Sequence, residues 1–132
     1  MTPKKLLLAE DDVDDQQLFL DFLQNRSDIF IMAIVENGVD LFHSLEQILN
    51  EESLPDLIIL DQNMPKRNGL QTLQLLKQSD RYTHIPVMVY STYTDSELVK
   101  NSIDLGASIV VAKPITKEGY HKMIDAFLEV FQ

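Results

Sequence analysis

The sequence contains no cysteine and only four glycines, at positions 38, 69, 106 and 119. The absence of cysteine excludes disulfides, thiolate zinc sites and cysteine nucleophiles, and it is neutral on the redox compartment. The glycines form neither GxGxxG nor GxxxxGKS/T, the two patterns that cradle the phosphates of nucleotides. Nucleotide binding is therefore not expected.

Long apolar runs and positive charge are also scarce. No apolar run is long enough to cross a bilayer, and Lys4 and Lys5 precede only four apolar residues, too few for a signal peptide. We therefore expect a cytoplasmic protein that does not bind membranes. The 11 basic residues are outnumbered by 21 acidic ones, giving a net charge of −10, which disfavours direct binding to nucleic acid.

The length favours a single domain over residues 1–132, because 132 residues with 45% hydrophobic side chains can bury a core without disulfides or a structural metal. Apolar stretches predict five strands, and amphipathic segments between and after them predict five helices. Because continuous apolar strands need cover on both faces, this alternation predicts an α/β fold with a parallel sheet. The predicted strands are Lys4–Ala9, Ile29–Val35, Asp56–Leu60, Ile85–Tyr90 and Ile109–Val111.

Two helices have informative ends. The fourth, roughly Asp95 to Leu105, has Thr94 and Glu97 at the spacing of a capping box. The last helix has the clearest apolar periodicity, from Tyr120 onward, but Gly119 is an unusual residue near its start.

Polar residues follow the apolar strands at their carboxyl ends, which share one edge of a parallel sheet where ligands bind. Converging carboxylates would repel one another without a cation, and oxygen-only ligands favour magnesium. A lysine and a hydroxyl group complete a site for an anion. Together these groups could hold a phosphoryl group while the carboxylate of Asp61 attacks in line. The residues at this edge are Glu10, Asp11, Asp12, Asp61, Ser91, Thr92 and Lys113.

Simpler interpretations exist for the same residues. The acidic run from Glu10 to Asp15 could be a solvated helix start, Ser91 could simply end a strand, and Lys113 could be an edge lysine. The three histidines, at positions 43, 84 and 121, fall in helices or a loop rather than at the strand ends, so a serine-histidine-aspartate triad is not expected.

The order and spacing of these residues resemble the receiver domains of response regulators in two-component signalling, over essentially the whole chain. The acidic pair after the first strand, Asp61 followed by Gln-Asn-Met-Pro and Gly69, Ser91 at the end of the fourth strand, and the Lys113-Pro114 pair carry the resemblance. It implies a flavodoxin-like, doubly wound sheet of five parallel strands in the order 2-1-3-4-5.

The resemblance also implies roles at the site. Asp61 would accept a phosphoryl group from a histidine kinase, a histidine phosphotransfer protein or a small phosphodonor. Mg²⁺ would be bound by Asp11, Asp61 and the backbone carbonyl of Asn63, and by Glu10 largely through water; a slip of one residue would replace Glu10 and Asp11 with Asp11 and Asp12. Ser91 and Lys113 would bind the phosphoryl group, with a cis peptide before Pro114.

The conformational switch departs from the family pattern. The family often has an aromatic residue in the fifth strand where this chain has Val110. Either Tyr90 or Tyr93 takes over the role, or the switch depends on the loop after the fourth strand alone. We further hypothesise that Tyr93, two residues after the switch hydroxyl, shields the site and slows hydrolysis.

With no output domain after the last helix, we expect a stand-alone module that signals in trans through its fourth helix, fifth strand and fifth helix, to an unknown effector or within a homodimer. It would catalyse only its own phosphorylation and dephosphorylation. The alternatives are a haloacid-dehalogenase-like phosphatase, a binding-only pseudo-receiver and a flavin carrier. The phosphatase needs a second acid two residues after its nucleophile, where this chain has Asn63.

Overall fold

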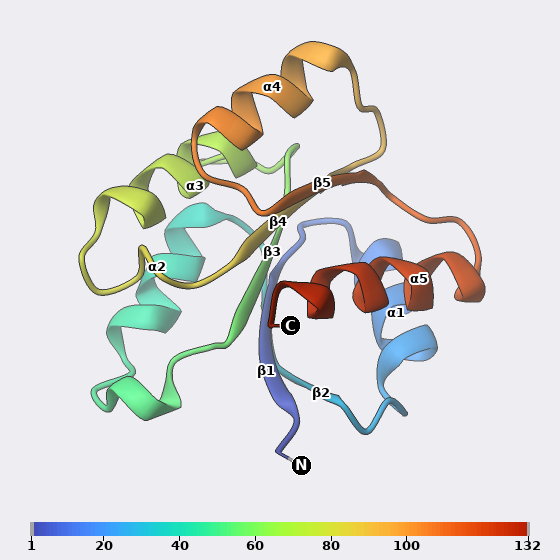
Figure 1. Cartoon of the computed structure of the whole chain (residues 1–132), viewed down its shortest axis with the longest axis horizontal. Coiled ribbons are helices and arrows are strands. Elements are labelled where there is room, and N and C mark those ends of the chain that lie inside the picture. The colour runs from blue at the N-terminus through green and yellow to red at the C-terminus, as the bar shows by residue number, and fades with distance from the viewer. Residues whose placement is uncertain (1, 132) are drawn as a thin grey trace.

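A computed structural model describes residues 2–131 as one parallel sheet of five strands in the order β2-β1-β3-β4-β5. Figure 1 shows α1 and α5 on one side of the sheet and α2, α3 and α4 on the other. The predicted fold and strand order are confirmed. In chain order the elements are β1 (Lys4–Ala9), α1 (Val13–Leu23), β2 (Ile29–Val35), α2 (Gly38–Glu46), a 3-10 turn (Glu51–Ser53), β3 (Leu57–Asp61), α3 (Gly69–Gln78), β4 (Val87–Ser91), α4 (Ser96–Asp104), β5 (Ile109–Ala112), α5 (Lys117–Leu128) and a final 3-10 turn (Glu129–Phe131).

The third and fourth strands end one residue later than predicted, and they also begin later, at Leu57 and Val87. β3 includes Asp61 and β4 includes Ser91, so both residues are the last of their strands. Their backbones are therefore fixed by the sheet ladder, with Asp61 paired to Tyr90 and Ser91 paired to Ala112.

The predicted capping box of the fourth helix is wrong. Asp95, one residue after Thr94, is the N-cap of α4, and its side chain accepts a hydrogen bond of 2.8 Å from the backbone N–H of Leu98. A carboxylate suits a helix start better than a hydroxyl group because its negative charge also interacts favourably with the helix dipole.

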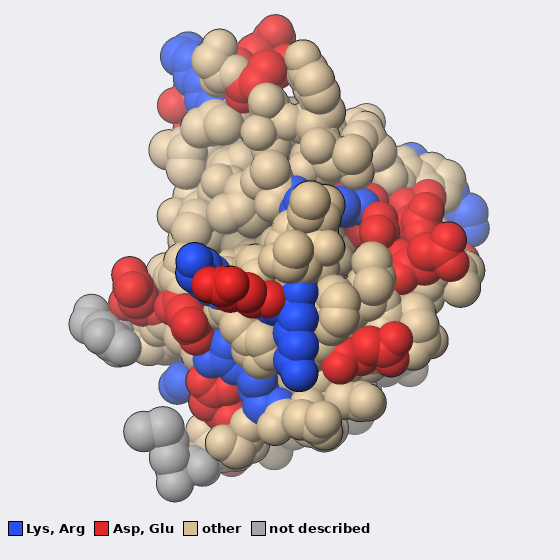
Figure 2. Space-filling model, turned by 90° about the vertical axis from the view of Figure 1, so that its right-hand side faces the viewer, with Lys and Arg blue, Asp and Glu red and all other residues tan. Residues whose placement is uncertain are grey.

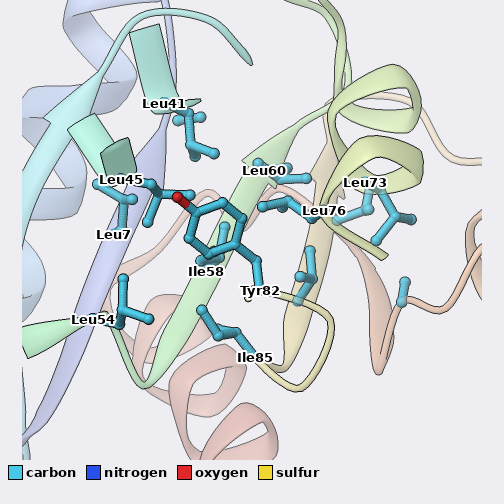
Figure 3. Close-up of a cluster of buried hydrophobic side chains, with 14 residues drawn as sticks. Leu7, Leu41, Leu45, Leu54, Ile58, Leu60, Leu73, Leu76, Tyr82 and Ile85 are labelled. Carbon is cyan, nitrogen blue, oxygen red and sulfur yellow. The ribbon is translucent and has the colours of Figure 1, made fainter. Parts of the chain in front are cut away.

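The strand side chains alternate between two apolar clusters, one on each face of the sheet. Ile58 and Leu60 point into the cluster under α2 and α3, whereas Leu57 and Ile59 point into the cluster under α1 and α5. Figure 3 shows the first cluster, in which the ring of Tyr82 lies among aliphatic side chains from the strands and α2. Because both faces are buried, polar side chains are left to the edges and ends of the sheet.

The layer of α1 and α5 is held by apolar and ionic contacts. The ring of Phe19 meets that of Tyr120 edge-on, with centroids 6.0 Å apart. At the surface, Arg26 pairs with Asp28 at 2.6 Å and with Asp125 at 2.8 Å, which joins the end of α1 to α5. Figure 2, which turns this side toward the viewer, shows acidic and basic side chains lying next to one another across it.

The connection from β5 to α5 explains Gly119. A methyl group added at Gly119 would lie 2.9 Å from Cβ of Pro114, so the close return of the chain leaves no room for a side chain. The cis peptide expected before Pro114 is wrong, because the peptide bonds of residues 2–131 are all trans. Trans is the form that an X–Pro bond favours unless tertiary contacts select cis.

Among residues 2–131, no helix combines the length and the apolar character needed to span a membrane.

Candidate functional site

Three carboxylates converge where β1 and β3 end. Oxygen atoms of Glu10, Asp11 and Asp61 all lie within 4.8 Å of one another; Glu10 and Asp61 are buried and Asp11 is half-buried. Asp12 is exposed and instead caps α1, accepting a hydrogen bond of 3.0 Å from the backbone N–H of Asp15. Of the two acidic pairs that the sequence allows, the structure brings Glu10 and Asp11 into the cluster with Asp61.

Lys113 stands at the centre of this acidic cluster. Its Nζ lies 2.9 Å from Oε1 of Glu10, 2.9 Å from Oδ2 of Asp15 and 3.3 Å from Oδ2 of Asp61. The backbone places it there: the N–H of Lys113 donates a hydrogen bond of 2.9 Å to the carbonyl oxygen of Ser91, which extends the pairing of β4 and β5. One cation is therefore shared by three anions.

Glu10 is fixed on both of its carboxylate oxygens. The hydroxyl group of Tyr90 donates a hydrogen bond of 2.6 Å to Oε1, and the backbone N–H of Asp12 donates one of 3.1 Å to Oε2. Burial and the charge of Glu10 raise the pKa of the Tyr90 phenol above its ordinary range, so Tyr90 keeps its proton and remains a donor. The orientation of Glu10 is thus set by its protein partners.

The charges at the site explain why it suits a cation. Burial, followed by the neighbouring Glu10, raises the pKa of Asp61 from 3.8 to about 7, against the opposing effects of Lys113 and of the Asn63 N–H. Burial lowers the pKa of Lys113, but the bonds to Glu10 and Asp15 outweigh it and raise that pKa above its ordinary range. Because one lysine does not neutralise three acids, a hard divalent ion with oxygen ligands fits this set of donors.

Asp61 faces an open pocket. The residues that line the pocket are Asp11 and Asp12 from the loop after β1, Asp15 from α1, Asp61 from β3, Asn63, Thr92 and Lys113. The N–H of Asn63 donates a hydrogen bond of 3.3 Å to Oδ1 of Asp61. Ser91 is buried at the end of β4, where its hydroxyl group accepts the N–H of Tyr93 at 3.4 Å.

The structure separates the three residues considered for the switch. Val110 is half-buried against the cluster under α2 and α3, whereas Tyr90 points into the cluster under α1 and α5. Tyr90 therefore cannot fill the place of an aromatic residue at position 110, because it lies on the opposite face of the sheet. Tyr93 is 77% exposed and lies outside the described lining of the pocket, so in this conformation it does not cover Asp61.

Sequence reasoning missed the roles of Tyr90, Asp15 and Gly69. The sequence suggests Tyr90 as a strand residue and a possible substitute for the switch aromatic, but not as the partner of Glu10, and it suggests Asp15 only as part of an acidic helix start. Helical spacing gave no signal for Asp15, because Asp11 precedes α1, which begins at Val13. Gly69 is part of the pattern that carries the resemblance, but its packing role depends on a close approach that the pattern does not show: an added Cβ would lie 2.7 Å from the carbonyl oxygen of Asp61.

Comparison with known proteins identifies the family of this chain. The model of the response regulator receiver domain matches residues 6–125. This chain belongs to that family. The resemblance predicted from the sequence is confirmed, and receiver domains are the phosphoacceptor modules of two-component signalling, which receive phosphate from histidine kinases.

Two curated relatives show how the receiver compares in length. The chain is 30% identical over 128 residues to the probable C4-dicarboxylate response regulator DctR of Bacillus subtilis, covering 97% of this chain but 54% of DctR. It is 30% identical over 124 residues to response regulator Rcp1 of Synechocystis, covering 92% of this chain and 84% of Rcp1. The chain thus spans about half of DctR and most of Rcp1.

Solved structures agree with the fold. The Mn²⁺-bound form of Rcp1 is 30% identical, with a TM-score of 0.78 over 94% of this chain and 91% of that one. The phosphorylated cyanobacterial phytochrome response regulator RcpA is 28% identical, with a TM-score of 0.80 over 96% of this chain and 92% of that one.

Proposed function

We propose that this receiver domain accepts a phosphoryl group on Asp61 from a histidine kinase or a histidine phosphotransfer protein, and that the modified protein acts as a signalling switch in the cytoplasm. The observation that carries the proposal is the position of Asp61: its carboxylate ends β3 at an open pocket, with Nζ of Lys113 at 3.3 Å. The structure of phosphorylated RcpA, a relative with the same fold, supports it.

The transfer uses few protein groups. A carboxylate oxygen of Asp61 forms the bond to phosphorus while the bond from phosphorus to the donor's imidazole nitrogen breaks, and the imidazole keeps that electron pair. Lys113 offsets the charge of the phosphoryl oxygens. The raised pKa of Asp61 means that a bound cation also favours the ionised, nucleophilic form of this carboxylate.

The cation would be Mg²⁺, bound by Asp11, by Asp61 and by the backbone carbonyl of Asn63. Glu10 would contact it through water, since both oxygens of Glu10 already accept hydrogen bonds from Tyr90 and from the Asp12 N–H. When bound, the ion neutralises the acids and the transferring phosphoryl group. The solved Mn²⁺-bound form of Rcp1, a relative with the same fold, supports the binding of a divalent ion.

The switch would begin at Ser91, whose hydroxyl group would turn to the phosphoryl group. The output would be the face of α4, β5 and α5, acting in trans on an effector or within a homodimer. The exposed apolar residues Val99 and Ile103, four positions apart on α4, support a contact surface there. Val110 offers no bulky side chain to exchange, so we propose that the loop after β4 carries the change.

We propose that the protein catalyses only its own phosphorylation and dephosphorylation, since Asn63 stands where a phosphatase of the haloacid-dehalogenase type has its second acid. Tyr93 would need to move toward Asp61 to shield it. A Tyr93→Ala variant that loses phosphate no faster than the parent would remove the shielding hypothesis.

Intact-mass spectrometry after treatment with acetyl phosphate and Mg²⁺ tests the phosphoacceptor. One phosphoryl group per chain is expected on the parent and none on Asp61→Asn. Asp14→Asn, which removes an exposed acid from α1, serves as the control that stays labelled. Persistent labelling of Asp61→Asn would mean that another residue is the acceptor.

A further inference from the structure

Lys113 has more partners than its proposed role requires. An ammonium group has three N–H donors, and the three carboxylates of Glu10, Asp15 and Asp61 surround it at 2.9, 2.9 and 3.3 Å. Before any phosphoryl group arrives, Lys113 donates a hydrogen bond to Asp15 and forms ion pairs with Glu10 and Asp61. A phosphoryl group on Asp61 would therefore compete with these carboxylates for Lys113.

The three carboxylates differ in the free energy that each would lose if its ion pair with Lys113 were broken. The side chain of Glu10 is 0% exposed and that of Asp61 is 3% exposed, whereas the side chain of Asp15 is 28% exposed. A carboxylate that loses its cation in a buried place stays desolvated, while an exposed one is hydrated by water. Asp61 also carries the phosphoryl group itself. Asp15 is thus the partner that can release Lys113 at the lowest cost.

The fold keeps Asp15 in place for this contact. It is the third residue of α1, and its backbone N–H donates to the side chain of the N-cap residue Asp12. Its carboxylate borders the same pocket as Asp61. By contrast Asp14, the preceding acid in the same helical turn, is exposed and lies outside the described lining of that pocket.

We propose that Asp15 is a positioning residue that holds the Lys113 ammonium group in the unphosphorylated protein, and that a phosphoryl group on Asp61 must take Lys113 from Asp15. This inference rests on the proposed function. Asp15 therefore disfavours the phosphorylated state by the free energy of one ion pair. Because Asp15 belongs to α1, phosphorylation of Asp61 would change a contact of that helix.

Beryllofluoride, a phosphoryl mimic, tests the competition at equilibrium when added with Mg²⁺ and followed by NMR. We expect Asp15→Asn to bind it about fivefold more tightly than the parent, the size typical of one partly exposed ion pair. Asp14→Asn removes the same charge from the same turn and should change the affinity by less than about twofold. Equal affinities for the Asp15 and Asp14 variants would overturn the inference.

A second measurement separates positioning from a simple effect of charge on the bound anion. In metal-free protein with ¹³C-labelled lysine, the ε-methylene signal of Lys113, assigned with Lys113→Arg, should move in Asp15→Asn and stay in Asp14→Asn. Tighter binding without any change of that signal would mean that Asp15 acts on the anion alone, and would overturn the inference. Failure of the parent itself to bind beryllofluoride would instead contradict the proposed function.

Discussion

The hydroxyl group of Tyr90 donates a hydrogen bond of 2.6 Å to Glu10, and both residues are fully buried. Tyr90 comes from β4 and Glu10 follows β1, while β3 lies between these strands in the sheet. The bond therefore crosses the strand that ends in Asp61, and it ties the two neighbours of that strand together beneath the acidic cluster.

Replacing Tyr90 with phenylalanine should loosen Glu10 while keeping the packing. Because a buried carboxylate would lose one hydrogen-bond donor, we expect the unfolding free energy, measured by urea denaturation, to fall by about 1.5 to 3 kcal/mol. We also expect Mg²⁺ affinity, measured by calorimetry, to fall about tenfold because the orientation of a cation-binding acid is lost.

Tyr82→Phe is the matched control for that substitution. Tyr82 is also buried, but it lies in the other apolar cluster (Figure 3), and its hydroxyl group meets only the side chain of Arg81, at 3.3 Å, among the contacts of the described residues. Equal losses of Mg²⁺ affinity in both variants would show that the Tyr90 bond has no special effect on Glu10.

Magnesium should stabilise the folded protein by relieving the repulsion among Glu10, Asp11 and Asp61. At 100 times the dissociation constant, binding adds about 2.7 kcal/mol, and the melting temperature should rise by about 10 °C. Asp11→Asn should lose most of this gain, whereas Asp12→Asn, which keeps a good helix cap, should retain it. Loss of the gain in Asp12→Asn as well would assign the site to Asp11 and Asp12.

The metal-free protein should lose stability as pH rises from about 4 to 7. The pKa of Asp61 is raised from 3.8 to about 7 in the folded state, so its contribution to stability is full below pH 3.8 and is lost as pH rises through about 7. The full pKa difference would correspond to about 4 kcal/mol, and screening by water in the open pocket reduces our expectation to about 2 kcal/mol.

Urea denaturation in the presence of a chelator, across pH 4 to 8, measures this change as the difference between the parent and Asp61→Asn. Mg²⁺ should restore the lost stability most strongly at the alkaline end. A difference that does not vary with pH would contradict the raised pKa.

Gly69→Ala should destabilise the junction of β3 and α3. The new Cβ would lie 2.7 Å from the carbonyl oxygen of Asp61 and 2.9 Å from Cα of Gln62, and backbone atoms cannot move aside cheaply. We expect a loss of about 2 kcal/mol in spite of the better helix propensity of alanine. Ser96→Ala, at the equivalent exposed first position of α4, should change stability by less than about 0.5 kcal/mol. A similar loss in both variants would mean that the close approach is unimportant.

The parts of the fold that sequence predicts well depend on local patterns. The bounds of β1 and β2 agree with the prediction because apolar runs end sharply in polar residues there. The acids, Ser91 and Lys113 were expected at one edge because parallel strands place their carboxyl ends together. The capping of α4 was wrong because Thr94 and Asp95 are adjacent acceptors, and the pattern of residue types did not decide between them.

Contacts between distant elements were beyond such patterns. The partner of Tyr90 is 80 positions away in the chain, and that of Asp15 is 98 positions away. A tyrosine in an apolar strand and an aspartate in an acidic run each have an ordinary local explanation. Only the packed structure shows that Tyr90 contacts Glu10 and that Asp15 contacts Lys113, beside Asp61.

Tyr90 and Val110 lie on opposite faces of the sheet. Tyr90 supports the acids from the face covered by α1 and α5, and Val110 lies on the face covered by α2 and α3. Under the proposed function, a substitution at Tyr90 and one at Val110 would therefore act from opposite faces of the sheet, the first on the orientation of Glu10 and the second on the residue that stands at the switch position of β5.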